Sequence, residues 1–214
     1  MSELKKIFTD IYNKSIWNGK ESKSGKGSDL ENTKTVIEEI VSLVKDYDIK
    51  YITDCACGDF NWMKEVLKKL PEVHYLGYDI VEPLIENNDK LYGNDRTYFQ
   101  CVDITSNPLP KSDLIICRDC LVHLSFDNIK KFIKNFVESG SRYLLVTSFV
   151  GDFRVNKDYE EYERMWRTIS FHKEPFNYPE PLETIIEGCT QDKHKFHDKS
   201  LLFYSRKQLL NVAS

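Results

Sequence analysis

The sequence has little that would place it in a membrane or on a nucleic acid. None of its apolar runs approaches the roughly 18 residues that a membrane-spanning helix requires, and no long apolar stretch follows the first residues, so we expect no signal peptide. Its 30 Lys and Arg are outnumbered by 34 Asp and Glu, for a net charge of −4, whereas a dedicated nucleic-acid binder needs a cationic face. We therefore expect a cytoplasmic protein (in the host cytoplasm if the source is viral) that neither inserts into membranes nor binds nucleic acid.

Neither disulfides nor a metal site is expected. The six cysteines stand at positions 55, 57, 101, 117, 120 and 189. Most of them lie within or at the ends of apolar runs that predict buried strands, where Cys behaves as a small core hydrophobe and stays reduced. Cys117 and Cys120 have C-x-x-C spacing but no second pair. His194, His197 and Asp198 are close in sequence, but no further ligand is evident.

Strands and helices alternate from residue 30 to about residue 150. The strands are expected at 50–54, 73–79, 97–103, 113–117 and 143–149, and the helices at about 29–44, 61–70, 82–91 and 127–138. Such alternation predicts right-handed βαβ units and a mainly parallel α/β sheet. A short amphipathic helix is expected at 4–12, and an antiparallel pair of strands at 182–187 and 200–204.

The 214 residues are expected to form a single domain, with a helix and loop at 1–29, a core at 30–150, an insert at 151–181 and C-terminal strands at 182–206. The polar segment from Asn18 to Asp29 is either a flexible surface loop or a lid that covers a ligand. Asp29 or Ser28 is expected to cap the helix that follows.

Ligands of parallel sheets bind at the carboxyl ends of the strands, and acidic residues follow four of the expected strands. The turn Asp54–Asp59 contains Ala56 and Gly58, which let a ligand approach the backbone closely. Asp79 comes about 20 residues later, where an acid can accept hydrogen bonds from both ribose hydroxyls of an adenosine. Asp103 and Asp119 follow the next two strands. Each could equally cap a helix, so only the series is informative. The G-x-G-x-x-G fingerprint of nicotinamide and flavin enzymes is absent.

With these residues the sequence resembles the class I S-adenosylmethionine-dependent methyltransferases, from about Ile16 to Tyr204. The resemblance implies a Rossmann-like, seven-stranded, mainly parallel sheet with helices on both faces and an antiparallel C-terminal strand. It also implies S-adenosylmethionine as the cofactor. Four segments narrow the resemblance to a subgroup associated with bacterial and large-virus glycan synthesis: Ile16-Trp17-Asn18-Gly19, Gly25–Asp29, Gly58–Trp62 and Arg118–Leu124. Such enzymes are often fused, so the chain is also compatible with one domain of a longer polypeptide.

The resemblance implies a role for individual residues. Asp54, Ala56 and Gly58 belong to the glycine-rich motif, Asp79 to the ribose site, and Asp103 with Ile104 to the adenine site. Ser28 is expected to close over the methionine carboxylate, and Trp17 to pack on the ligand. Ile80 and Arg118 complete the expected cofactor contacts. Trp62 could pack on the ligand or in the core.

His123 and Asp119 lie four residues apart, so a helical turn beginning at Asp119 would place both side chains on one face. Such a pair can take a proton from an attacking hydroxyl, with His123 as the base and Asp119 as its partner or as an acceptor ligand. A structural histidine is the alternative.

The insert offers polar residues among the aromatic side chains Phe153, Trp166, Phe171 and Phe176. These candidates for acceptor binding are Arg154, Asn156, Arg167 and Asn177. The mixture suits a carbohydrate and equally suits a cap on the core. We therefore expect an O-methyltransferase that acts on a sugar hydroxyl of a glycan or glycan precursor. The alternatives are methylation of a nitrogen on a small molecule or protein, and a non-catalytic cofactor-binding module of a larger complex.

Overall fold

The computed structural model describes residues 2–158 and 166–212. It divides the chain into two compact units, unit 1 at Met1–Ile104 and unit 2 at Thr105–Ser214. Residues 159–165 of the expected insert lie outside the described residues.

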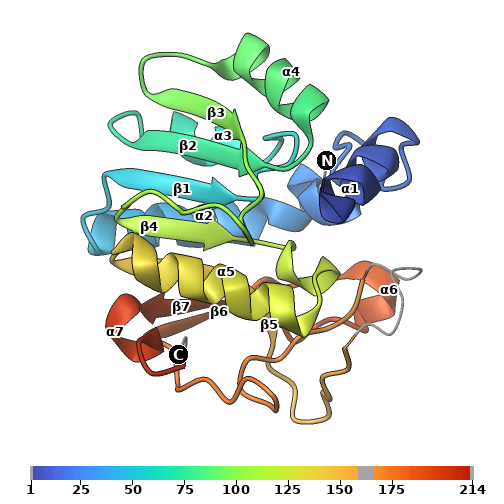
Figure 1. Cartoon of the computed structure of the whole chain (residues 1–214), viewed down its shortest axis with the longest axis vertical. Helices are drawn as coiled ribbons and strands as arrows, with labels where there is room; N and C mark the ends of the chain where they lie inside the picture. The colour runs from blue at the N-terminus through green and yellow to red at the C-terminus, as the bar shows by residue number, and fades with distance from the viewer. Residues whose placement is uncertain (1, 159–165, 213–214) are drawn as a thin grey trace. The chain divides into compact units, whose positions relative to one another are not determined.

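Unit 1 contains three parallel strands in the order β3-β2-β1 (Figure 1). They are β1 (Tyr51–Cys55), β2 (His74–Asp79) and β3 (Thr97–Cys101). The register pairs Asp54 with Gly77 and Asp79 with Cys101. The strands therefore end level with one another, and the segments that follow them meet at one edge.

Five helical segments accompany these strands: α1 (Glu3–Asn13), η1 (Lys26–Ser28), α2 (Leu30–Asp46), α3 (Met63–Lys68) and α4 (Glu82–Tyr92). Val36, Ile37 and Ile40 belong to the buried stripe of α2 that the sequence predicts. Helix α3 is shorter than the expected 61–70. Phe60, three residues before its first residue, has a φ of 60°, a left-handed conformation that does not belong to a helix.

Unit 2 contains four strands in the order β4-β5-β7-β6, with β4 (Leu114–Cys117) parallel to β5 (Tyr143–Phe149). β7 (Lys199–Ser205) is antiparallel to both β5 and β6 (Glu183–Ile186). The helical segments are η2 (Leu121–His123), α5 (Phe126–Ser139), α6 (Gln191–His194) and α7 (Arg206–Leu209).

Local sequence explains the long helix α5. Ser125 accepts a hydrogen bond from the Asn128 amide as its N-cap, and Gly140 ends it with a φ of 72°. The expected apolar stripe, which includes Phe132 and Ile133, is fully buried.

The fold class expected from the sequence is confirmed. The chain forms a seven-stranded sheet that is mainly parallel, is flanked by helices and carries an antiparallel C-terminal strand. All six cysteines are free thiols, and four of them are buried. Among the described residues, no helix is long and apolar enough to cross a membrane.

Candidate functional site

The turn that follows β1 requires a glycine at position 58. Gly58 has a φ of 55°, and a Cβ atom there would lie 2.4 Å from the Ser24 Oγ atom. Ala56 beside it is partly exposed. The Asp54 side chain is 2% exposed and accepts a hydrogen bond of 2.8 Å from the Tyr75 hydroxyl. The turn therefore offers backbone at its surface, while Asp54 is bonded inside unit 1.

Asp79, at the end of β2, is a buried carboxylate with unused bonding capacity. It is 8% exposed, and its two oxygens accept hydrogen bonds from the backbone amides of Gly58 (3.2 Å) and Val81 (3.0 Å). None of the ion pairs formed by the described residues includes Asp79, and burial raises its pKa to about 6. Because a carboxylate has about four acceptor positions, Asp79 retains acceptor capacity for a ligand donor such as a ribose hydroxyl.

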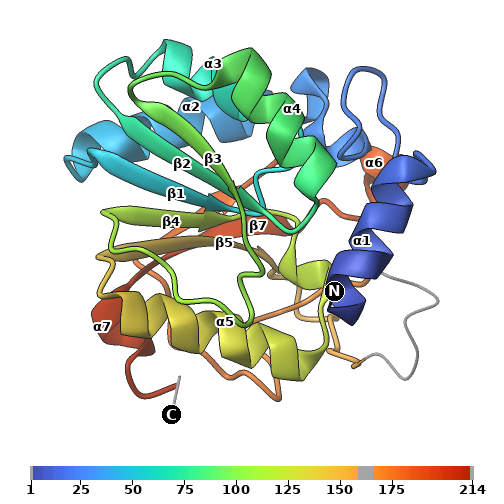
Figure 2. The same cartoon turned by 45° about the horizontal axis from the view of Figure 1, so that its top comes forward.

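Figure 2 shows the loop that joins α1 to α2. Two carboxylates hold this loop. Asp29 accepts hydrogen bonds from the backbone amides of residues 20, 21 and 22. Asp59 accepts from the Lys23 amide (2.7 Å) and from the hydroxyls of Ser22 and Ser24. The expectation that Asp29 or Ser28 caps α2 is confirmed in position for Asp29 but not in hydrogen bonding. Asp29 occupies the N-cap position, but its side chain makes no capping hydrogen bond because the loop engages it.

The other expected cofactor residues of unit 1 lie in or beside these segments. The Ser28 carbonyl accepts a hydrogen bond of 3.0 Å from Asn61, and Trp17 packs edge-on against Phe8 at 5.9 Å. Ile80 and Asp103, which follow β2 and β3, are partly exposed, whereas Ile104 is buried. Trp62 is 6% exposed, as core packing requires.

A network of four charged side chains lies in unit 2. Arg118 forms two hydrogen bonds with Glu187, at 3.2 and 2.7 Å, and lies 3.4 Å from Asp119. The Lys199 ammonium lies 2.5 Å from Asp119 and 3.2 Å from Glu187. Burial opposes ionisation of Asp119, but the Lys199 and Arg118 charges hold its pKa below the ordinary value. Asp119 is the most exposed member, with a side chain 25% accessible.

Asp119 and His123 do not share a helical face, so that expectation is wrong. Asp119 has a φ of 55° and lies before η2, which contains His123. The Asp119 amide instead donates to the Thr147 hydroxyl of β5 (2.9 Å). His123 is 9% exposed and interacts electrostatically with Asp119. A role for His123 as the base stays a prediction.

Three of the four expected acceptor-binding residues, Arg154, Asn156 and Arg167, use their side chains to hold the insert. Arg154 forms an ion pair with Asp198 and bonds the Lys195 carbonyl, and Asn156 bonds the backbone at Ser170 and Glu174. Arg167 donates to the carbonyls of Val122 and Leu124. Asn177 adopts a φ of 48°. Acceptor contact stays a prediction for all four.

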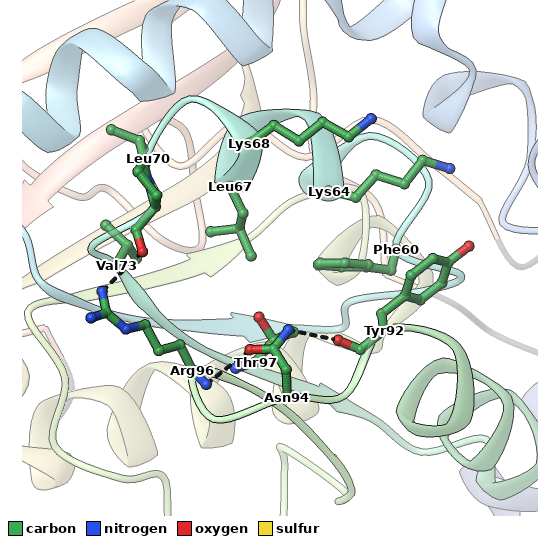
Figure 3. Close-up of a pocket in the computed structure, with 11 residues that line it drawn as sticks. Phe60, Lys64, Leu67, Lys68, Leu70, Val73, Tyr92, Asn94, Arg96 and Thr97 are labelled. Carbon is green, nitrogen blue, oxygen red and sulfur yellow. Dashed lines mark hydrogen bonds between the residues drawn. The ribbon is translucent and has the colours of Figure 1, made fainter.

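A pocket of about 330 Å³ in unit 1 lies elsewhere (Figure 3). Val73 and Thr97 place it at the amino ends of β2 and β3, and none of the expected site residues lines it. In Figure 3 the Lys64 and Lys68 amino groups extend away from the space between the side chains. This pocket therefore lies away from the carboxyl ends of β1 and β2, where the expected cofactor residues Gly58 and Asp79 stand.

The sequence did not identify five residues that shape these regions: Ser22, Ser24, Asp59, Glu187 and Lys199. Glu187 and Lys199 stand at the ends of the last two expected strands. That position at strand ends is the feature of the sequence that could have identified them. The serines lie 35 or more residues from Asp59, so only the fold reveals the contact.

Comparisons with known proteins agree with this arrangement. Residues 53–139 match a family described as a methyltransferase domain. A search of the curated proteins found no significant match. Among solved structures, magnesium protoporphyrin IX methyltransferase from Synechocystis PCC 6803 with bound SAH aligns with a TM-score of 0.61 and 16% identity, over 94% of this chain and 99% of that one.

Two further structures are similar. Human N-acetylserotonin methyltransferase in complex with SAM aligns with a TM-score of 0.62 and 12% identity, over 95% of this chain and 60% of that one. Mitomycin 7-O-methyltransferase aligns with a TM-score of 0.59 and 13% identity, over 79% and 53%. At such identities the likeness establishes the fold. Together with the family match it supports an enzyme of the methyltransferase kind with S-adenosylmethionine as its cofactor.

Proposed function

We propose that this chain is an S-adenosylmethionine-dependent O-methyltransferase that acts on a sugar hydroxyl of a glycan or glycan precursor. The observation that carries the cofactor assignment is Asp79, a buried carboxylate with no charged partner among the described residues, placed beside the turn at Gly58. The match of residues 53–139 to a methyltransferase domain supports the same assignment.

The chain's own residues fit the cofactor. Asp79 would accept hydrogen bonds from the two ribose hydroxyls, and Gly58 with Ala56 would bring backbone amides close to the ligand. Asp103 and Ile104 would flank the adenine, with Ile80 beside them. Ser28 would bind the methionine carboxylate, Trp17 would pack on the ligand, and Arg118 and Asp54 are proposed as supporting contacts. When bound, the cofactor supplies a methyl group already activated by its sulfonium.

The protein must then orient the acceptor and remove its proton. We assign the proton to His123, because imidazole is the side chain that most often serves as a general base. Asp119 stays ionised beside Lys199 and Arg118, so it acts as a fixed hydrogen-bond acceptor rather than as a base.

The sugar acceptor rests on the subgroup resemblance and on the composition of the insert. Phe153 and Trp166 are exposed, and aromatic faces of this kind suit a sugar ring. Arg154 and Arg167 add forked donors nearby in sequence, with Asn156 and Asn177 as polar neighbours. A structurally similar protein, mitomycin 7-O-methyltransferase, is named for methylation of an oxygen.

The first test is calorimetric titration of the purified chain with S-adenosylmethionine and S-adenosylhomocysteine. We expect micromolar or tighter binding, and a strong loss in Asp79→Ala, because hydrogen bonds to a buried carboxylate are lost. Methylatable glycans would then be screened for methyl transfer. No binding of either compound would refute the cofactor assignment. Binding without transfer to any hydroxyl acceptor would favour a cofactor-binding module.

A further inference from the structure

Asn88 of α4 is a polar side chain buried entirely inside unit 1. Its exposed fraction is 0%, and its Nδ2 atom donates a hydrogen bond of 2.8 Å to the Gly58 carbonyl. Its Oδ1 atom has no hydrogen-bond partner among the described residues. A buried amide with an unpaired oxygen is costly for stability. Packing alone therefore does not explain an asparagine at this position. The hydrogen bond that its Nδ2 atom donates to Gly58 is the feature that points to a role.

The bond from Asn88 fixes one peptide plane of the turn. The Gly58 carbonyl shares a peptide group with the Asp59 amide, which donates to the Ser24 hydroxyl at 2.9 Å. On its other side, the Gly58 amide donates to Asp79 at 3.2 Å. Gly58 is thus held through both of its peptide groups, in a left-handed conformation with a φ of 55°. A glycine without these bonds would sample many other conformations.

We propose that Asn88 is a positioning residue for the cofactor, which holds the Gly58–Asp59 peptide so that the Gly58 turn and Asp79 keep the geometry that receives the adenosine. This inference rests on the proposed function. Asn88 has no contact with the ligand in this proposal. It acts through Gly58, and nothing in the family match or the structural comparisons assigns it a role.

The neighbouring residue provides a matched control. Asn87 is exposed on the same helix. The same substitution at Asn87 therefore removes an identical amide group that faces solvent and not the turn. Asn88→Ala removes the donor. We expect it to weaken S-adenosylhomocysteine binding about tenfold, the effect of one lost buried hydrogen bond, while Asn87→Ala leaves binding unchanged.

Asn88→Asp separates positioning from packing. An ionised carboxylate would face the Gly58 carbonyl and repel it, whereas a protonated one can donate a hydrogen bond to that oxygen. The affinity of Asn88→Asp for S-adenosylhomocysteine, divided by that of wild type at the same pH, should therefore rise as the pH is lowered from 8 to 5.5. Burial favours the protonated form of the new carboxyl, which can donate the hydrogen bond. Asp79 titrates in both proteins, so dividing the two affinities at equal pH removes its effect on binding. The Cys57 thiol, 4.0 Å from Nδ2, stays protonated because burial raises its pKa. Asn87→Asp should show no such recovery.

Hydrogen exchange of the Asp59 amide in the ligand-free protein provides a second measurement. We expect faster exchange in Asn88→Ala than in wild type or Asn87→Ala under conditions in which all three are folded. Unchanged affinity together with unchanged exchange would overturn the proposal, as would a pH-independent loss in Asn88→Asp. If wild type itself binds no S-adenosylhomocysteine, the proposed function fails and the cofactor part of this inference fails with it. The exchange rate of Asp59 then decides whether Asn88 holds the turn.

Discussion

The raised pKa of Asp79 predicts that the free energy of unfolding decreases when this buried carboxyl group ionises. Folding shifts this pKa from 3.8 to about 6. The folded protein therefore binds more protons than the unfolded chain between these values, and its stability falls as pH rises from about 4 to about 6. A shift of about two pKa units corresponds to roughly 3 kcal/mol across the full titration. The substitution Asp79→Asn should remove this pH dependence.

Chemical denaturation of wild type and Asp79→Asn at pH 4 and pH 7 would measure the effect. The quantity compared is the change in unfolding free energy between the two pH values, because the substitution also exchanges one acceptor oxygen for a donor. We expect wild type to lose roughly 2 kcal/mol more than the variant, which is less than the full value because the unfolded carboxyl is already more than half ionised at pH 4.

Ligand binding should show the opposite trend with pH. Ribose hydroxyls donate to the ionised carboxylate, so S-adenosylhomocysteine should bind wild type about tenfold more weakly at pH 5 than on the plateau above pH 7. Equal pH dependence of stability in wild type and Asp79→Asn, or an affinity that is flat between pH 5 and pH 7, would refute this reasoning.

Three other substitutions test the remaining features. Gly58→Ala should destabilise the protein by about 1–3 kcal/mol, seen in thermal unfolding, because its Cβ would meet Ser24 and its φ is positive. Lys199→Met should cost about 3–5 kcal/mol by leaving a buried negative charge uncompensated, and adding Glu187→Gln should restore part of that loss; a double variant no more stable than Lys199→Met would contradict the pairing. His123→Ala should reduce turnover by roughly 100-fold or more with cofactor affinity nearly intact, and full activity would exclude it as the base.

The sequence predicted best where local patterns decide the structure. The helix expected at 127–138 depends on an apolar stripe whose residues stand within a few positions of one another, and it is confirmed as α5. The same kind of pattern located the strands and the antiparallel C-terminal pair. The order of acidic residues after the strands located Asp79 at the end of β2, because strand ends are visible in the apolar pattern.

Prediction failed where a side chain had a choice of partners. Asp29 has a good capping chemistry, yet the loop before it supplies three backbone amides that compete for its carboxylate. Asp119 was expected in a helical turn with His123, but its ionic partner Lys199 lies 80 residues away. Such distant pairings depend on the register of strands, which the apolar pattern does not encode.

The close approach of Gly58 and Ser24 has a consequence for how these two positions can evolve. One residue lacks a side chain at the point where the other places its hydroxyl, and the Asp59 amide bonds that same hydroxyl. A larger residue at either position would require a compensating change at the other. Among relatives that keep this loop, the two positions should therefore vary together, although 33 residues separate them. Covariation of this pair would identify those relatives in which the loop between α1 and α2 packs on the turn at position 58 as it does here, whatever their substrates.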